Sequence, residues 1–235
     1  MERSNAVTAG RRHPRRRSEH LVEDLLDAAA IEFASHGYDG ASTRRIADRA
    51  GAHQPQINYH FHSKEHLWRA TVTRLFEMMQ HQLRVPVEAT GPVGTFSDAI
   101  RRFLRFSSAR PELNRIINLE ATSPSSRLDW LVATHLDPLH QAVGSAWAAL
   151  RASGEGADLT GDEVWELVTS YGALHFANAP MLSRLRTGAG GDPPAGPPER
   201  GPSDPAIDPA IDPATEAHAD SVLRMLFPDR VPGPR

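Results

Sequence analysis

Residues 42–67 read STRRIADRAGAHQPQINYHFHSKEHL, and this stretch decides the fold of the first part of the chain. Ser42 is a good N-cap, because its side chain can accept a hydrogen bond from a free backbone N–H of the first turn. The spacing that follows predicts a helix over Thr43–Ala50, with Ile46 and Ala47 on its inner face. The small Ala47 lets a second helix cross closely at this point.

A second helix is predicted over Gln54–Phe61, after a turn for which Gly51 supplies the permissive backbone. Pro55 falls in the first turn of this helix, the part where proline is tolerated. Ile57 and Phe61 face inward. The outward side chains are those of Gln54, Gln56, Asn58, Tyr59 and His60. The stretch therefore predicts a helix-turn-helix whose second helix offers partners for base edges and phosphates.

A third helix is predicted upstream, over Glu19–His36. Apolar residues recur every four positions along it, which gives a broad stripe for packing. Gly37 ends the helix, and Tyr38 follows in the position that packs back on the last turn. We expect this helix to support the helix-turn-helix and to set its orientation.

The stretch FASHGYDGASTRRIADRAGAHQPQINYHFHSKEHLWRA, residues 33–70, resembles the N-terminal DNA-binding domain of the TetR family of bacterial transcriptional regulators. The resemblance extends from about Leu25 to about Leu75. The residues in register are Phe33, Gly37, Tyr38, Ser42, Ile46, Ala47, Ala50, Gly51, Tyr59, Phe61, Ser63, Lys64 and Leu67. It implies an all-α chain, in which an N-terminal three-helix helix-turn-helix DNA-binding domain is followed by a helical ligand-binding and dimerisation bundle.

The resemblance also implies a set of DNA contacts. The matching residues are Thr43, Arg44, His53, Gln54, Gln56, Tyr59, His60 and Lys64. Thr43 matches a phosphate contact, and Arg44 matches a side chain that reaches a guanine edge. His53, Gln54 and Gln56 match base-reading positions. Tyr59, His60 and Lys64 match contacts to the DNA backbone.

Two positions depart from the family pattern. Asn58 stands where many members carry Tyr, so that phosphate contact is not expected here. Gln56 stands where a small residue or Thr is common, and its amide could favour an adenine through a bidentate contact. Lys64, in contrast, fits the pattern and is the only lysine of the chain. It falls in the first turn of the next helix, where a helix N-terminus and a cation can hold one phosphate together.

Residues 1–18 are predicted to form a disordered basic arm that ends where Ser18 can cap the first helix. Such an arm can lie in a minor groove or along phosphates; a solvated tail without contacts is the alternative. Residues 1–74 hold 12 Lys or Arg against 9 Asp or Glu, while the remainder holds 14 against 20. A basic N-terminal region followed by an acidic region is consistent with a DNA-binding domain joined to a domain with another role.

The rest of the chain also reads as helical. The expected helices cover Lys64–Val85, Phe96–Ala109, Pro111–Leu119, Arg127–Ala152 with an interruption near Pro138, and Gly161–Arg186. The domain boundaries are therefore placed as 19–66 for the helix-turn-helix domain, 67–186 for the ligand-binding and dimerisation domain, 187–214 for a Pro-rich disordered linker, and 215–227 for a C-terminal docking helix. The apolar face of that last helix is too short to be stable alone, so a partner helix or a partner subunit should cover it.

Several function classes lack support in the sequence. The chain has no cysteine, which leaves no disulfide and no thiolate zinc site. No serine lies in a nucleophile-elbow context, and His135 and His140 are poorly spaced for two ligands on one helix face. No apolar run approaches the roughly 20 residues of a membrane span. We therefore expect no enzyme, no metal, no cofactor and no membrane partner, and a cytoplasmic, nucleoid-associated protein.

Aromatic residues and histidines of the second half are candidates for an effector pocket, although an ordinary core explains each of them as well. The candidates are Phe103, Trp130, His135, Trp147, His175 and Phe176. A pocket lined in this way would favour a small, uncharged, apolar or aromatic effector, with His135 or His175 supplying one hydrogen bond.

Together these features predict a homodimer that binds a palindromic operator in double-stranded DNA and responds to a ligand. We expect it to repress transcription rather than to activate it. Two alternatives come from other classes. One is a DNA-bound scaffold that recruits a protein partner without any small molecule, and the other is an enzyme that merely carries a helix-turn-helix.

Overall fold

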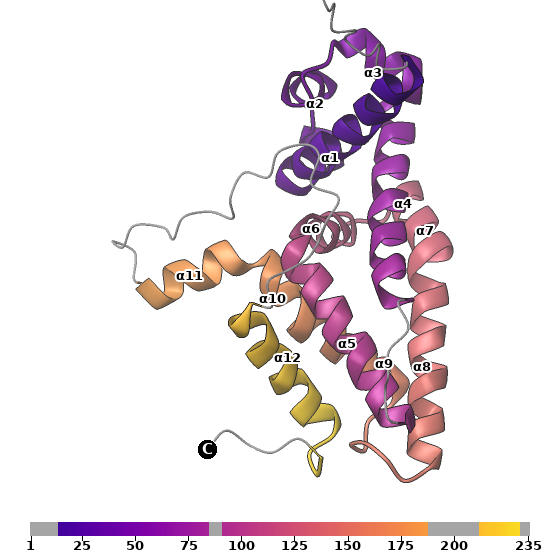
Figure 1. Ribbon diagram of the computed structural model, residues 1–235, viewed down its shortest axis with the longest axis vertical. Coiled ribbons are helices and arrows are strands. Elements are labelled where there is room, and N and C mark those ends of the chain that lie inside the picture. Colours follow the sequence, from indigo (N-terminus) through magenta and orange to yellow (C-terminus); the bar gives the residue numbers. More distant parts are fainter. Residues whose placement is uncertain (1–13, 85–90, 188–211, 231–235) are drawn as a thin grey trace, which may run out of the picture.

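The computed structural model describes residues 14–84, 91–187 and 212–230, and the regular elements of these ranges are all helical (Figure 1). In chain order they are α1 (Pro14–Gly40), α2 (Thr43–Arg49), α3 (Gln54–Phe61), α4 (Lys64–Leu83), α5 (Gly91–Ala109), α6 (Pro111–Glu120), α7 (Ser126–Leu131), η1 (Val132–Leu136), α8 (Asp137–Ala152), α9 (Gly161–Glu166), η2 (Leu167–Ala173), α10 (Leu174–Ala177), α11 (Ala179–Thr187) and α12 (Pro213–Leu226). The predicted all-α class is confirmed. None of these helices has the length and apolar character needed to cross a membrane.

The helix-turn-helix forms at the predicted residues. The Ser42 side chain caps α2 by accepting a hydrogen bond from the backbone N–H of Arg45. Gly51 takes a φ of 63° in the turn, a conformation that glycine adopts without strain. α3 then covers the predicted span, with Pro55 in its first turn. These boundaries come from local signals: a cap, a glycine and a proline.

α1 differs from its predicted span at both ends. It begins at Pro14 rather than Glu19, so residues 14–18 of the predicted arm are helical. A proline is well placed at the first helical position, because the N–H that it lacks would have no helical partner there. The rest of the predicted arm, residues 1–13, lies outside the described residues. At the other end, Gly37 leaves helical geometry with a φ of 66°, and a last turn continues to Gly40.

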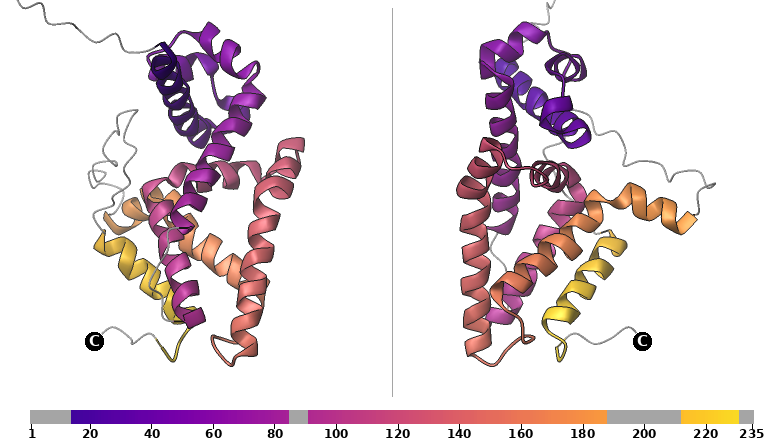
Figure 2. Two further views of the ribbon diagram at one scale, coloured as in Figure 1. Left: turned by 45° about the vertical axis from the view of Figure 1, so that its right-hand side comes forward. Right: turned by 180° about the vertical axis from the view of Figure 1, so that it is seen from behind.

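Two apolar cores hold the molecule together. The first packs α1, α2, α3 and α4 against side chains of α5, α6 and α7, among them Phe106 and Leu131. The second joins α5, α8, α9, η2 and α12 around Trp147. The long α4 runs from the helix-turn-helix down into the bundle (Figure 1 and Figure 2). Both α4 and α6 contact α1, so a displacement of helices in the bundle could change the position of α1–α3.

α12 docks on its own chain, which shows what covers the apolar face predicted over 215–227. Its buried residues pack with α5 and η2 in the second core. Gly172 of η2 permits the close approach of α5, because a Cβ there would lie 2.9 Å from Leu104 Cδ2; Val222 of α12 would lie at 3.6 Å, an ordinary packing distance. Arg101 and Arg105 of α5 add ion pairs to Glu216 of α12. The predicted linker lies almost wholly outside the described residues.

Wide π-helical turns interrupt two long helices of the bundle. The predicted break near Pro138 takes the form of η1, which ends immediately before α8 begins at Asp137. The helix predicted over Gly161–Arg186 is not continuous: it passes through η2 and turns at Asn178 before α11. π-turns inside α-helices are frequent at functional sites.

A buried carboxylate fixes α2 on α1. Glu32 of α1 is 2% exposed, and its Oε1 accepts hydrogen bonds from the backbone N–H of Ser42 at 2.9 Å and from Arg45 Nε at 2.7 Å. Burial alone would raise the pKa of Glu32, but the hydrogen bonds from Arg45 and Ser42 outweigh it and lower the pKa below its ordinary value of 4.5. The ionised carboxylate therefore stabilises the orientation of the helix-turn-helix.

We expect Glu32→Gln to lower the free energy of unfolding at pH 7 by about 1–3 kcal/mol, because the charge-assisted hydrogen bonds of Arg45 and Ser42 are weakened. Because the folded pKa is lowered, this contribution is present above pH 4.5 and is lost as the pH falls through the folded value. Denaturant unfolding at several pH values measures it. The matched control is Glu65→Gln, whose ion pair with Arg69 is more exposed; an equal loss in both variants would contradict the role of Glu32.

Candidate DNA-binding surface and ligand cavity

The residues predicted to contact DNA lie on α2, on α3, at the N-cap of α3 and, in the case of Lys64, at the start of α4. Arg44, His53, Gln54 and Tyr59 are exposed, and Tyr59 is 78% exposed although it is large and aromatic. The other predicted contacts are partly buried: Thr43, Gln56, His60 and Lys64. An exposed tyrosine flanked by polar side chains is suited to a phosphate backbone and to base edges.

Internal hydrogen bonds already position part of this surface. Gln54 Nε2 donates to Thr43 Oγ1 at 3.4 Å and so bridges the two helices of the motif. Gln56 Oε1 accepts a hydrogen bond from the backbone N–H of His53 at 2.8 Å, which caps α3. A bidentate contact from Gln56 to adenine would have to replace this cap. The sequence pattern did not show that competition.

Lys64 lies at the junction of α1 and α4. Its Nζ donates to the backbone carbonyl of Asp39 at 3.1 Å and lies 4.9 Å from the centre of the Tyr38 ring. Partial burial lowers the pKa of Lys64 below its ordinary value. The ammonium group is thus held in place beside the recognition helix while part of it remains open to a phosphate.

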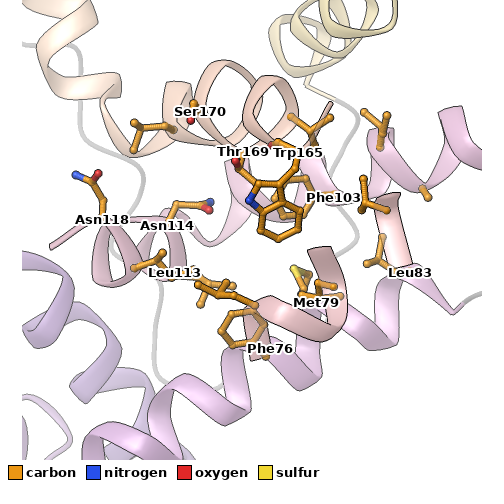
Figure 3. A pocket seen from close by; sticks show the side chains of 18 of the residues that line it. Phe76, Met79, Leu83, Phe103, Leu113, Asn114, Asn118, Trp165, Thr169 and Ser170 are labelled. Atoms are coloured by element: carbon orange, nitrogen blue, oxygen red, sulfur yellow. Dashed lines mark hydrogen bonds between the residues drawn. The ribbon is translucent and has the colours of Figure 1, made fainter. Parts of the chain in front are cut away.

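A cavity of about 310 Å³ lies inside the bundle, between α4, α5, α6, α8 and η2 (Figure 3). None of the described residues that line it carries a charge, and most of the lining is apolar. The lining residues are Phe76, Met79, Leu83, Phe96, Ala99, Ile100, Phe103, Leu113, Asn114, Ile117, Asn118, Ala121, Leu136, Leu139, Val143, Trp165, Val168, Thr169, Ser170 and Leu174. Both π-turns contribute to the wall: Leu136 comes from η1, and three residues come from η2.

The polar residues of the cavity lie on α6 and η2. They are Asn114, Asn118, Thr169 and Ser170. Asn114 Nδ2 is buried and has no hydrogen-bond partner among the described residues. Thr169 Oγ1, in contrast, donates to the carbonyl of Trp165 at 2.7 Å. Hydrophobic periodicity could not identify Asn114, because a polar residue beside an apolar stripe reads as solvent-facing.

Of the residues predicted for the effector pocket, Phe103 lines this cavity and the other five do not. His135 lies behind the wall, stacked on Phe76 with ring centres 4.4 Å apart, and burial lowers its pKa. Trp130 packs edge-on against Trp68 in the first core.

The remaining three belong to the second core or its edge. Trp147 is buried there and donates from Nε1 to the carbonyl of Leu159. His175 stacks on His218, with ring centres 4.1 Å apart, and Phe176 packs edge-on against the same histidine. The bundle thus uses these side chains for packing between helices, which is the alternative that the sequence left open.

α6 connects the cavity to the helix-turn-helix. Leu113, Asn114 and Ile117 face the cavity, whereas Ile116 belongs to the core that α6 shares with α1. Glu120, the last residue of α6, is 8% exposed.

Arg127 of α7 completes this connection. It pairs with Glu120 at 3.1 Å and lies 3.8 Å from the centre of the Tyr38 ring. A change in α6 would therefore act directly on the end of α1.

Comparison with known proteins supports the assignment of the N-terminal region to DNA binding. Residues 25–71 match the family model described as "Bacterial regulatory proteins, tetR family". The chain is 28% identical to the HTH-type transcriptional regulator RutR of Escherichia coli over 96 residues, which are 41% of this chain and 45% of RutR. The chain therefore spans only about half the length of that relative. It is also 28% identical to the HTH-type transcriptional repressor AcnR of Corynebacterium glutamicum over 171 residues, 71% of this chain and 82% of AcnR.

The fold is similar to solved structures as well. A TetR-like transcriptional regulator from Rhodococcus sp. RHA1 superposes with a TM-score of 0.60 at 17% identity, covering 91% of this chain and 96% of the other. The relatives are regulators and not enzymes. The match begins and ends within a few residues of the predicted limits, and it lies on the helices that carry most of the side chains predicted to contact DNA. Residues 25–71 form a DNA-binding domain of the TetR family of bacterial transcriptional regulators.

Proposed function

We propose that the protein is a homodimeric repressor, which binds a palindromic DNA operator and is released from it by a small uncharged effector. The observation that carries the proposal is the double role of α6, which forms a wall of the cavity and also packs against α1. We propose repression rather than activation of transcription because the chain is similar to AcnR, which is described as a repressor.

In the proposed complex, α3 enters the major groove and Arg44 reaches a base edge from α2. Arg44 is exposed and makes no ion pair in the described part of the chain, so its guanidinium is free to bind a guanine. Lys64 and Tyr59 hold the phosphates on the two sides of the groove. The two classes of contact respond differently to DNA sequence and to salt.

We expect Arg44→Ala to weaken binding to an operator selected in vitro from random duplexes by about 1–3 kcal/mol, with a smaller effect on random DNA. Lys64→Ala should weaken binding to both DNAs alike. It should also reduce the slope of log affinity against log salt by about 0.9 for each phosphate that the lysine neutralises in the wild type. Fluorescence anisotropy titrations at several salt concentrations measure both effects.

Arg84→Ala is the matched control, because it removes an exposed arginine at the opposite end of α4. Its affinity and its salt slope should match those of the wild type. An equal loss on both DNAs for Arg44→Ala would assign Arg44 to the phosphate contacts. An unchanged salt slope for Lys64→Ala would mean that Lys64 touches no phosphate.

The surface proposed for the dimer lies on α11 and α12. α11 projects from the bundle beyond α12 (Figure 1 and Figure 2), and on it Met181 is 54% and Leu185 73% exposed. Tyr171 of η2 and Met225 of α12 are also large, apolar and exposed. A helix of nine residues is too short to be stable without packing. A second copy, related by a two-fold axis, would cover these side chains and place two recognition helices on one operator.

We expect the double variant Met181→Asp, Leu185→Asp to sediment as a monomer at micromolar concentration, because a dimer would bury two charges per subunit without partners. Operator affinity should fall with dimerisation. The control Val132→Asp replaces another exposed apolar residue, on η1 and away from α11, and should remain a dimer. A wild-type chain that stays monomeric, both free and on DNA, would contradict the two-fold arrangement.

The proposed switch begins when a ligand occupies the cavity and shifts α6. The shift alters the contact of Arg127 with Tyr38 and hence the end of α1, which carries the helix-turn-helix. The ligand and the operator then favour different arrangements of the same helices, and binding of one weakens binding of the other.

We expect a thermal-shift screen of small molecules to yield a hit that raises the melting temperature and lowers operator affinity. In Arg127→Gln the same hit should still raise the melting temperature, but its effect on operator affinity should shrink, because glutamine places no cation on the Tyr38 ring. Arg84→Gln is the control and should keep the full effect. Stabilising hits that never change DNA binding would favour the scaffold alternative, in which the bundle recruits a protein partner.

A further inference from the structure

We propose that Asn114 recognises a hydrogen-bond acceptor on the effector, so that the cavity selects uncharged molecules with an apolar body and one carbonyl oxygen, as in a ketone, ester or amide. This inference rests on the proposed ligand-controlled function and names the ligand class of the same cavity. It differs from the pocket expected from the sequence, in which a histidine supplied the polar contact.

The apolar body follows from the wall of the cavity. Phe76, Phe103 and Trp165 contribute aromatic faces, and the other contacts are mostly aliphatic (Figure 3). In the described lining no side chain carries a charge, so a carboxylate or an ammonium group would lose its hydration without gaining an ionic partner there. The cavity therefore discriminates against charged ligands.

The acceptor follows from the state of Asn114. Its Nδ2 is buried without a partner, and a buried donor that lacks an acceptor is costly to the protein. Figure 3 shows its amide turned towards Thr169 and Trp165, whereas Asn118, one turn further along α6, points away from them. A ligand oxygen placed here would satisfy the free N–H.

The neighbouring polar group does not compete for this role. The Thr169 hydroxyl already gives its proton to the Trp165 carbonyl, so it has no proton left to donate to a ligand. Asn118 and Ser170, the other polar residues of the lining, are exposed and can bind water instead. Asn114 Nδ2 is thus the buried amide donor without a protein partner in the described part of this cavity, and the Trp165 indole N–H is a second donor group of the lining.

The position of Asn114 links recognition to the proposed switch. It lies on α6 between Leu113, a member of the first core, and Arg115, whose Nε donates to the carbonyl of Ala177 on α10 at 3.0 Å. A ligand that binds Asn114 pulls on the helix that also contacts α1. An apolar molecule of the same shape fills the cavity without this directional contact.

Three molecules with ten carbon atoms each test the inference on the full-length protein. Butyrophenone carries a ketone, butylbenzene has a methylene group in its place, and 4-phenylbutanoate carries a carboxylate. Calorimetric titration of the wild type should show butyrophenone binding about tenfold tighter than butylbenzene, the worth of about one hydrogen bond to an otherwise unsatisfied donor. 4-Phenylbutanoate should bind more weakly than either.

Asn114→Leu removes the donor while keeping a side chain of similar size, and it should reduce the preference for the ketone to less than twofold. Asn114→Ala, which cannot overfill the cavity, should do the same. Asn118→Leu makes the identical change one turn away and should keep the tenfold preference. Binding of butylbenzene by each variant shows that its cavity is intact.

The outcomes separate this inference from the function on which it rests. If the wild type binds both neutral molecules equally, Asn114 does not recognise the acceptor. The same conclusion holds if Asn114→Leu and Asn114→Ala keep the preference for the ketone. In both cases the cavity remains a ligand-binding site. Tight binding of 4-phenylbutanoate would overturn the selection against charge. If the wild type binds none of the three molecules, the cavity is not a site for ligands of this class, and the proposed effector fails together with the inference.

Discussion

The side chain of Tyr38 holds the DNA-binding helices on the bundle, and most of the other arrangements depend on it. Its ring stacks on Phe33 of α1 and meets Trp68 of α4 edge-on, so it belongs to the first core. Its faces also receive two cations, Lys64 at 4.9 Å and Arg127 at 3.8 Å. Lys64 belongs to the proposed DNA surface and Arg127 to the segment that follows the cavity helix α6. One aromatic ring therefore lies between the two regions of the molecule.

The energies of the contacts to the Tyr38 ring are large enough for this ring to connect the cavity to the DNA-binding helices in the proposed switch. A cation–π contact that is partly desolvated is worth about 0.5–2 kcal/mol, and Arg127 is only 20% exposed. The coupling between an effector and a second ligand is typically about 1–3 kcal/mol. A repositioning of Arg127 on the Tyr38 ring is thus of the energetic size that such a switch requires. The ion pair of Glu65 with Arg69 on α4 is more exposed and is worth less, because water competes for both partners.

The sequence predicted the helix-turn-helix almost to the residue, whereas it predicted little of the cavity. Ser42, Gly51 and Pro55 act on their own turns, so their effect can be read without knowledge of the rest of the chain. The cavity instead depends on two π-turns and on helices that are distant in sequence. Trp130 and Trp147 were reasonable candidates by residue type, but tertiary packing assigns them to the cores. Asn114 could not be recognised, because its significance comes from burial without a partner.

The distribution of charge explains how one protein could combine a selective cavity with a sensitive junction. The cavity, as far as the structure describes its lining, has no charged side chain, so the proposed ligand is selected there by shape and by hydrogen bonding to an amide. The junction, in contrast, gathers Glu120, Arg127 and Lys64 around Tyr38, and charged contacts depend more steeply on distance and geometry than apolar ones. A small displacement of α6 that costs little within the apolar wall would therefore have its largest energetic effect at the junction, which is where the proposed movement of α1 and α3 would begin.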